Sequence, residues 1–402
     1  MNIACVYHPK PYLQSPTAQY GLGLLALATL ARQCGCDVAV IDGQGCEPDW
    51  APDAKADVWL LSGCLVDTPV IKRLIERLEG KVIVGGPISY SPEVVPSKAT
   101  VVNGPGESFV EHLCTGNGEA AFADFDKYPI PDRSMLDRYG GNIYHPRSGV
   151  KAGVSSTLLT SRGCQYSCAF CTSGNNGVKV HNYPISRIEQ ELEQIVGLGI
   201  EDIRISDDNI MASPERLYDV CRLLRTAGVR WRASVRVSNA SGEVYEEMAD
   251  SGCVEISFGV ESADPEVLRV IGKGSSVAQT ELSIARASMA GLHVRMLMMM
   301  GTPGERPETL LLNKQFVQKF PDAVASLAIF YPFPGTQIHQ NPSRYGCVLR
   351  ESEDSNICAF RPNGSTPEAN IDIVGGLSKD ELTEQFLEMR QFLVERGQDN
   401  QG

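Results

Sequence analysis

The chain of 402 residues contains no long apolar run. No stretch approaches the roughly 20 apolar residues that span a bilayer, so we expect no membrane partner. The first residues, MNIACVYHPK, lack a basic leader followed by an apolar segment, and we therefore expect a cytoplasmic protein. With 43% hydrophobic and 21% charged residues, the composition excludes disordered and fibrous classes.

The sequence also lacks a basic block. Lys and Arg number 36 against 49 Asp and Glu, which leaves a net charge of −13. A long polyanion is repelled by such a chain on average, so nucleic acid is not expected as a partner. No repeat of solenoid period and no low-complexity tract occurs, which excludes a repeat architecture.

Cysteine, by contrast, is abundant, with 13 residues. In a reducing cytosol such cysteines are thiols or metal ligands more often than a disulfide framework, and the number is odd. Three of them, Cys164, Cys168 and Cys171, cluster within eight residues. The chemistry of the chain is therefore expected to centre on this triplet.

Apolar runs alternate with helical patterns in the first part of the chain. Expected strands cover residues 3–7, 37–41, 58–62, 82–84 and 100–102, and expected helices cover residues 20–33 and 68–78. Strands separated by helices predict a parallel sheet in a doubly wound, Rossmann-like α/β domain over residues 1–116. Such sheets bind ligands at the carboxyl ends of their strands.

A second series of strands and helices follows an irregular linker, residues 117–154. Its expected strands cover residues 157–160, 202–206, 231–237, 254–260, 293–300 and 324–331. Six such units predict a partial (β/α) barrel over residues 155–340, with its active site at the strand carboxyl ends. Residues 341–402 form a C-terminal extension with one helix at 379–396. Helix boundaries are predicted by a capping box at Ser186, a cap at Ser213, and stops at Gly228 and Gly291.

The cysteine triplet directly follows the first strand of this second series. Structural zinc normally takes four protein ligands, and no matching second pair lies nearby, so the triplet indicates an open site. A 4Fe-4S cluster held by three thiolates leaves one iron free to bind a substrate. Zinc or a coincidental group of cysteines remains the alternative.

The spacing CxxxCxxC, with Phe170 before the last cysteine, resembles the signature of the radical S-adenosyl-L-methionine (SAM) enzymes. The resemblance implies a 4Fe-4S cluster on Cys164, Cys168 and Cys171, whose free iron chelates SAM. It also implies that an electron from the cluster cleaves SAM to a 5′-deoxyadenosyl radical. The expected electron donor is a flavodoxin or ferredoxin.

The same resemblance implies SAM contacts besides Phe170 at the ends of later strands. Asp207 and Asp208 would face the SAM ammonium group, where the alternative is a helix N-cap region. Ser234 and Arg236 would meet the ribose hydroxyls and the SAM carboxylate, unless Arg236 belongs to a structural ion pair. Glu261 would lie under the adenosine, where the alternative is a capped strand end.

A doubly wound domain before this barrel resembles the cobalamin-dependent branch of the family. The implied cobalamin contacts are Tyr20, Gly21, Ser62, Gly63, Gly85, Gly86, Pro87, Gly104, Gly106 and Glu107. Pro105 stands where the branch usually has an acidic residue, and no Asp-x-His-x-x-Gly occurs, so the histidine-ligated mode is not supported. A Rossmann-like scaffold without a corrin is the alternative.

The resemblance implies a methyltransferase acting on an unactivated carbon, or a phosphinate phosphorus, of a small-molecule or peptide biosynthetic intermediate. The methyl group would pass through methylcobalamin, and the 5′-deoxyadenosyl radical would activate the substrate. Three alternatives stay open: non-methylating radical chemistry such as rearrangement or cyclisation, a methylthiotransferase, and a non-catalytic cobalamin- or SAM-binding protein. Cys347 and Cys358 could be ligands or nucleophiles, but buried thiols are the simpler interpretation.

Overall fold

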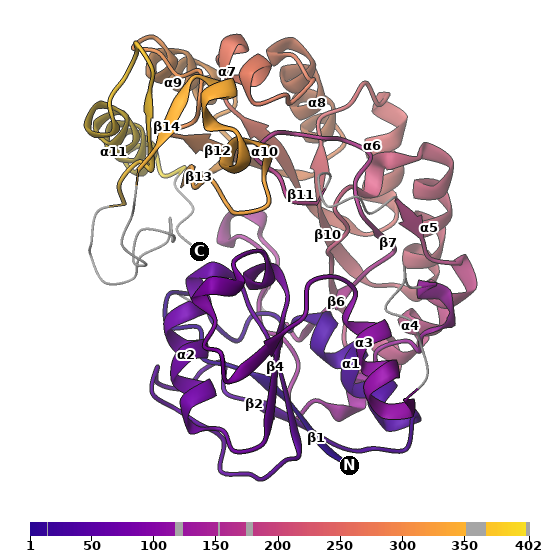
Figure 1. Cartoon of the computed structure of the whole chain (residues 1–402). Coiled ribbons are helices and arrows are strands. Elements are labelled where there is room, and N and C mark those ends of the chain that lie inside the picture. The colour runs from indigo at the N-terminus through magenta and orange to yellow at the C-terminus, as the bar shows by residue number, and fades with distance from the viewer. Residues whose placement is uncertain (14, 117–123, 152, 174–179, 351–366, 399–402) are drawn as a thin grey trace. The chain divides into compact units, whose positions relative to one another are not determined.

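The computed structural model describes all residues except 14, 117–123, 152, 174–179, 351–366 and 399–402, and Cys358 therefore lies outside the described residues. The chain divides into two compact units, which are described separately (Figure 1). Unit 1 comprises Met1–Ile143, Gly153–Leu158 and Tyr183–Glu201, and unit 2 comprises Tyr144–Ala152, Leu159–Asn182 and Asp202–Gly402. The protein is an α/β protein with parallel sheets.

Unit 1 contains a five-stranded parallel sheet in the order β2-β1-β3-β4-β5. Its strands are β1 (Asn2–Tyr7), β2 (Asp37–Asp42), β3 (Val58–Ser62), β4 (Lys81–Gly85) and β5 (Ala99–Val101). Its helices are α1 (Leu22–Gln33), α2 (Thr68–Arg77), α3 (Gly106–Thr115) and α4 (Ile185–Gly197).

Alternate residues of β1 enter two separate hydrophobic cores, because successive side chains of a strand point to opposite faces. Ile3 and Cys5 pack in the core that holds α1 and α3 residues such as Leu24 and Val110. Ala4 and Val6 pack in the other core, with α2 residues such as Ile71. Helices therefore cover both faces of this sheet, and its carboxyl edge is left for a ligand.

Unit 2 contains a parallel sheet in the order β13-β12-β11-β10-β9, whose strands pair in chain order. The strands are β9 (Asp202–Ile205), β10 (Arg230–Arg236), β11 (Cys253–Glu261), β12 (His293–Met300) and β13 (Val324–Ile329), whereas the short strand β6 (Ser155–Leu158) belongs to unit 1. The helices of unit 2 are α5 (Pro214–Ala227), α6 (Gly242–Asp250), α7 (Pro265–Val270), α8 (Val277–Met289), α9 (Thr309–Gln318), α10 (Gln337–Gln340) and α11 (Lys379–Glu395). Two short strand pairs complete it: β7 (Ser161–Arg162) with β8 (His181–Asn182), and β14 (Cys347–Leu349) with β15 (Ile371–Ile373).

The expected strands agree with the observed ones to within two residues, and the helix signals agree with one exception. Ser213 caps α5 through its hydroxyl, and Gly228 and Gly291 adopt positive φ angles of 68° and 81° at helix ends. The capping box at Ser186 is wrong, because α4 already begins at Ile185 with Pro184 as its N-cap and no side-chain cap. Among the described residues, no helix is both long and apolar enough to cross a bilayer.

The segment expected as a linker is divided between the units: its described residues up to Ile143 and from Gly153 belong to unit 1, and those from Tyr144 to Lys151 belong to unit 2. Arg133 is completely buried, and its guanidinium group pairs with Glu191 at 2.9 Å and donates to the Thr157 carbonyl at 2.7 Å. A buried arginine is tolerated only with such partners. Cys347 is buried at the start of β14, in agreement with the simpler interpretation of this thiol.

Candidate active site

The three predicted ligand cysteines lie on the loop that follows β7. Cys168 is buried, Cys164 and Cys171 are half-buried, and the Cys171 amide donates to the Cys168 carbonyl at 3.1 Å. Burial raises the pKa of the Cys164 thiol, and nearby Asp208, Cys171 and Cys168 raise it further. The loop thus carries one buried and two half-buried thiols within eight residues.

Arg236, the last residue of β10, reaches this loop. Its Nη1 lies 3.1 Å from the Cys168 sulfur, and its guanidinium carbon lies 3.8 Å from the centre of the Tyr166 ring. A guanidinium group in this position stabilises negative charge on the sulfur, and the ring orients the guanidinium group by a cation–π contact. The structure therefore brings Arg236 to the cysteine loop, whereas the sequence suggested a contact with the SAM carboxylate.

Backbone hydrogen bonds hold the same loop from two other segments. The Ala169 amide donates to the Ile271 carbonyl at 2.9 Å, and the Ala169 carbonyl accepts from the Ile338 amide at 3.1 Å. These partners follow α7 and begin α10, so residues far apart in the sequence fix one position between the second and third cysteines.

The two aspartates after β9 form hydrogen bonds with the residues that directly precede the first cysteine of the loop. Asp207 is buried and accepts from the Thr160 amide at 2.7 Å, the Thr160 hydroxyl at 2.5 Å and the Ser161 hydroxyl at 2.7 Å. Burial raises the pKa of Asp207 despite these bonds. Asp208 accepts from the Gly163 amide at 2.8 Å, directly before Cys164. Both carboxylates thus serve the turn that leads into the cysteines.

Glu261 closes β11 in a strained conformation. Its φ of 63° is positive, the only such value among the described residues that are not glycine. Its carboxylate pairs with Lys273 at 2.6 Å, and both side chains are buried. The Lys273 Nζ lies 5.9 Å from the centre of the Phe170 ring. Ser234 is half-buried two residues before Arg236, on the same face of β10.

The donor chemistry of the cysteine loop fits an iron–sulfur cluster. Thiolates are the usual cluster ligands, and one of the three sulfurs already accepts from a guanidinium group. Across the described ranges, no three His, Cys, Asp or Glu side chains converge as ligands of a single metal ion. A cube binds its cysteines through different irons, so they need not meet at one point as ligands of one ion must.

Loops at the carboxyl ends of β3 and β4 meet in unit 1. Gly86 has a φ of 81°, and a Cβ on it would lie 2.6 Å from the Ser62 hydroxyl. The Ile88 amide donates to the Gly63 carbonyl at 2.9 Å, and the Gly63 amide donates to the Gly85 carbonyl at 3.2 Å. Ser62, Gly85 and Gly86, with the adjoining Pro87, therefore form a side-chain-poor surface at the carboxyl edge, and the buried Gly63 bonds to both loops.

The other predicted cobalamin contacts have different surroundings. Gly104 has a φ of 121°, and a Cβ on it would meet no atom within 4 Å. A Cβ on Gly106 would lie 3.0 Å from Leu27, so this glycine serves helix packing. Glu107 is buried in the first turn of α3, and Tyr20 is buried with its hydroxyl donating to Asp42 at 2.8 Å.

Sequence reasoning missed a buried polar cluster at the same edge. Asp67 is fully buried and accepts from Lys10 at 2.8 Å, from the Cys64 amide at 2.7 Å and from the Tyr12 hydroxyl. An adjoining cavity of about 110 Å³ is lined by Tyr7, His8, Lys10, Gly21, Gly23, Leu24, Gln44 and Ser62. Gly21 and Ser62 are predicted cobalamin contacts, so the cavity and the glycine surface together fit the edge of a large flat cofactor. The signal was the polar residue three positions after Cys64, which completes a cap.

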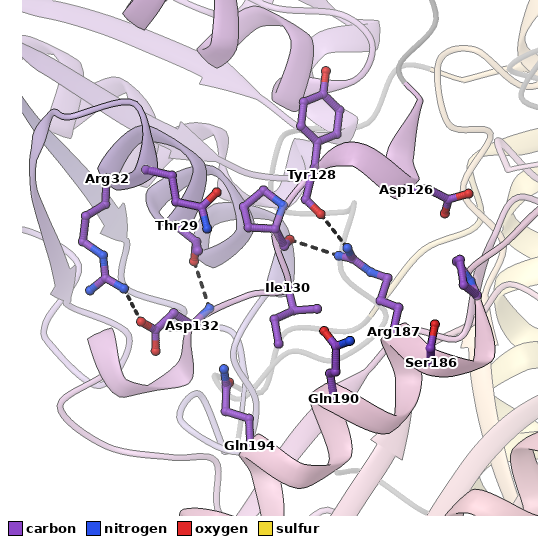
Figure 2. Close-up of a pocket in the computed structure, with 13 residues that line it drawn as sticks. Thr29, Arg32, Asp126, Tyr128, Ile130, Asp132, Ser186, Arg187, Gln190 and Gln194 are labelled. Atoms are coloured by element: carbon purple, nitrogen blue, oxygen red, sulfur yellow. Dashed lines mark hydrogen bonds and ion pairs between the residues drawn. The ribbon is translucent and has the colours of Figure 1, made fainter.

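A larger cavity of about 550 Å³ in unit 1 has none of the predicted site residues in its wall (Figure 2). Its arginines are already engaged. Arg187 donates to the carbonyls of Tyr128 and Pro129 at 2.5 and 3.0 Å. Figure 2 shows Arg187 pointing at Tyr128, and Arg32 paired with Asp132. This cavity is therefore not the candidate active site.

The chain is similar to known proteins in sequence and in fold. The profile of the radical SAM superfamily matches residues 158–316. An uncharacterized methyltransferase of Pyrococcus horikoshii is 28% identical over 79% of this chain and 77% of its own length. The bacteriochlorophyllide d C-12(1)-methyltransferase of Chlorobaculum tepidum is 24% identical over 78% of this chain and 72% of its own length. The structure of the radical SAM methyltransferase TsrM from Kitasatospora setae, with cobalamin and a 4Fe-4S cluster bound, has a TM-score of 0.68 at 17% identity and covers 96% of this chain and 90% of its own.

Proposed function

We propose that this chain, whose residues 158–316 match the family model of the radical SAM superfamily, is a cobalamin-dependent methyltransferase. The atom that receives the methyl group is an unactivated carbon, or a phosphinate phosphorus, of a small-molecule or peptide substrate. The observation that carries the proposal is the three-cysteine loop with Arg236 against Cys168. Two relatives named as methyltransferases match over more than two thirds of the chain and support this reaction class.

Cys164, Cys168 and Cys171 would hold a 4Fe-4S cluster, and the carboxyl edge of unit 1 would hold cobalamin. When bound, these groups supply an electron for cleaving SAM and a carrier for the methyl group. Phe170, Asp208 and Ser234 are proposed to contact SAM directly. Asp207, Arg236 and Glu261 stay predicted SAM contacts, and their observed partners give them the additional task of orienting the cysteine loop and the adjoining strand ends.

The proposal includes a domain division. Residues 1–116 would form the Rossmann-like cobalamin domain, 117–154 a linker, 155–340 a partial barrel and 341–402 an extension. Within the first domain, Gly21, Ser62, Gly63, Gly85, Gly86, Pro87 and Gly104 are proposed to line the corrin. Tyr20, Gly106 and Glu107 are proposed to shape that edge from behind, because their observed contacts lie within the fold.

The test is anaerobic reconstitution with iron, sulfide and hydroxocobalamin, followed by reduction with methyl-labelled SAM. We expect both 5′-deoxyadenosine and S-adenosylhomocysteine once a substrate is supplied. Loss of both products in the variant Cys168→Ser, with Cys46→Ser as the thiol control, supports the assignment. Deoxyadenosine without any S-adenosylhomocysteine would exclude methyl transfer and favour non-methylating radical chemistry.

A further inference from the structure

Charged side chains line the amino-terminal half of the sheet face that carries Arg236. The strand register pairs Arg204 of β9 with Arg232 of β10, Arg232 with Glu255 of β11, and Glu255 with His293 of β12. Directly paired residues project from the same face of a sheet. Arg295 lies two residues beyond His293 and shares this face. We call these five residues the basic floor.

This face differs from the opposite face of the same strands. On β10, Trp231, Ala233 and Val235 are buried, whereas the residues between them are half-buried. Figure 1 shows helices α5, α6 and α8 along one side of these strands, and α6 and α8 contact β11. The face that carries the basic floor is therefore the one that faces away from these helices.

Glu255 is the carboxylate at the centre of the basic floor. It is fully buried, and its Oε1 lies 3.1 Å from Arg232 and 3.0 Å from Arg295, while its Oε2 accepts from the His145 amide at 3.0 Å. Burial raises the pKa of Glu255, but Arg295, the His145 amide and Arg232 lower it by more, so it lies below its ordinary value. This carboxylate is therefore ionised, and both of its oxygens already have partners.

The positive charges of the basic floor exceed this one negative charge. Arg204, Arg232 and Arg295 interact with one another and with Glu255, and burial followed by the other two guanidinium groups lowers the pKa of Arg204 to about 10. Burial also lowers the pKa of His293, so the imidazole adds no charge near neutrality. Deeper on the strands, Arg230 pairs with Asp202 at 2.7 Å and is neutralised. Within the basic floor, three guanidinium groups thus face a single carboxylate.

Guanidinium groups held close together in a half-buried place repel one another, and an anion reduces that repulsion. Arg295 is 9% exposed, and its Nε finds no acceptor among the described residues. Arginine presents its donors in a fork that matches carboxylate and phosphoryl oxygens. The basic floor therefore has the charge and an unused buried donor for an oxyanion.

We propose that the basic floor binds the anionic group of the substrate, a carboxylate or a phosphoryl group. This inference rests on the proposed function and narrows the substrate class to anionic molecules. Arg232 and Arg236 are four residues apart on one strand, about 13 Å at roughly 3.3 Å per residue. Because Arg236 contacts Cys168, a substrate held by the floor would place its reacting atom on the order of 10 Å from its anionic group.

The test uses the reconstituted holoprotein and isothermal titration calorimetry with two probes, inorganic phosphate and succinate. We expect saturable binding of one or both, and the stronger probe identifies the anion. Arg204→Gln should weaken binding at least tenfold, and Glu255→Gln should strengthen it about threefold because it removes the competing carboxylate. Arg222→Gln, a 70% exposed arginine on α5, is the matched control and should bind as the wild type does.

Opposite effects of the two floor variants cannot arise from misfolding, which weakens binding in both. If Arg204→Gln fails to fold, the comparison of probe binding between the wild type and Glu255→Gln still tests the proposal. No saturable binding by the wild type, unchanged binding in Arg204→Gln, or displacement of the probe by saturating SAM would each overturn the proposal. Release of 5′-deoxyadenosine from SAM on the same samples reports the proposed function separately, because that reaction needs no floor anion.

Discussion

The guanidinium group of Arg236 lies 3.1 Å from the sulfur of Cys168, although 68 positions separate the two residues in the sequence. Tyr166, two residues before Cys168, carries the same guanidinium group on its ring. In the proposed cluster Cys168 would be a ligand, and a charged hydrogen bond to its sulfur would tune the electronic properties of the metal centre. The strand end of β10 thus takes part in the chemistry of the cysteine loop.

Removing this charge should change the reduction potential of the reconstituted cluster. A cation beside a ligand sulfur stabilises the more negative, reduced state, so Arg236→Gln should lower the midpoint potential on the order of 50 mV. EPR-monitored redox titration measures the shift. Arg236→Lys keeps the charge and should lie between the two proteins. A potential that is unchanged in both variants would show that Arg236 acts on the loop by packing alone.

Glu305 should make stability depend on pH near neutrality. Burial raises the pKa of this carboxyl to about 7, against which its bonds from Thr302 act only partly. Because the folded value is raised, its contribution is complete below the ordinary pKa and is lost as the pH rises through about 7. We expect the free energy of unfolding to fall by about 3 kcal/mol from this group between the ordinary pKa of 4.5 and a pH of about 7, and to change no further above that pH.

Denaturation between pH 5 and 9 tests this expectation. Glu305→Gln should flatten the dependence, since the amide does not titrate. Glu308→Gln, an exposed neighbour, should leave the profile of the wild type intact. A profile that Glu305→Gln does not alter would assign the dependence to other groups.

The pair of Glu261 and Lys273 should behave as a buried ion pair. Lys273→Met leaves the Glu261 carboxylate buried without its partner and should destabilise the protein by about 3 kcal/mol. The double variant with Glu261→Gln should recover part of this loss, because no charge then remains buried. Thermal unfolding of both variants measures the difference, with Lys319→Met, an exposed lysine, as the control. Equal losses in the single and double variants would contradict the pairing.

A comparison of alanine variants at Gly104 and Gly35 should distinguish an effect on cofactor binding from an effect of backbone strain. Gly104 and Gly35 both have positive φ angles, 121° and 83°, and a Cβ on either meets nothing within 4 Å. Alanine should therefore cost about 1–2 kcal/mol at both positions. Only Gly104 belongs to the proposed corrin surface, so Gly104→Ala alone should weaken retention of hydroxocobalamin, by about tenfold. Corrin absorption after gel filtration measures this, and equal retention in the two variants would remove Gly104 from the site.

The strands could be predicted from the sequence because they are local apolar runs. The expected strands at residues 58–62 and 293–300 are identical to β3 and β12, and the others differ only at their ends. The cap at Ser186 failed because Pro184 is also suited to the start of a helix, and propensity alone does not decide between neighbouring starts.

The partners of the site residues could not be predicted in this way. The contact of Arg236 with Cys168, the three bonds on Asp207 and the pairing of Glu261 with Lys273 all join residues distant in sequence or on separate loops. The cysteine triplet was recognisable because its three thiols occur within eight residues. The basic floor required the register of four strands, which alternating charges on single strands do not specify.

The most direct test of the account is an EPR spectrum of the reduced, reconstituted protein before and after SAM is added, with iron counted per chain. We predict close to four irons per chain, a cluster signal that SAM alters, and loss of that signal when the three loop cysteines are replaced by alanine. A mononuclear iron spectrum, or a cluster signal that SAM leaves unchanged, would contradict the assignment of an open iron position to this loop.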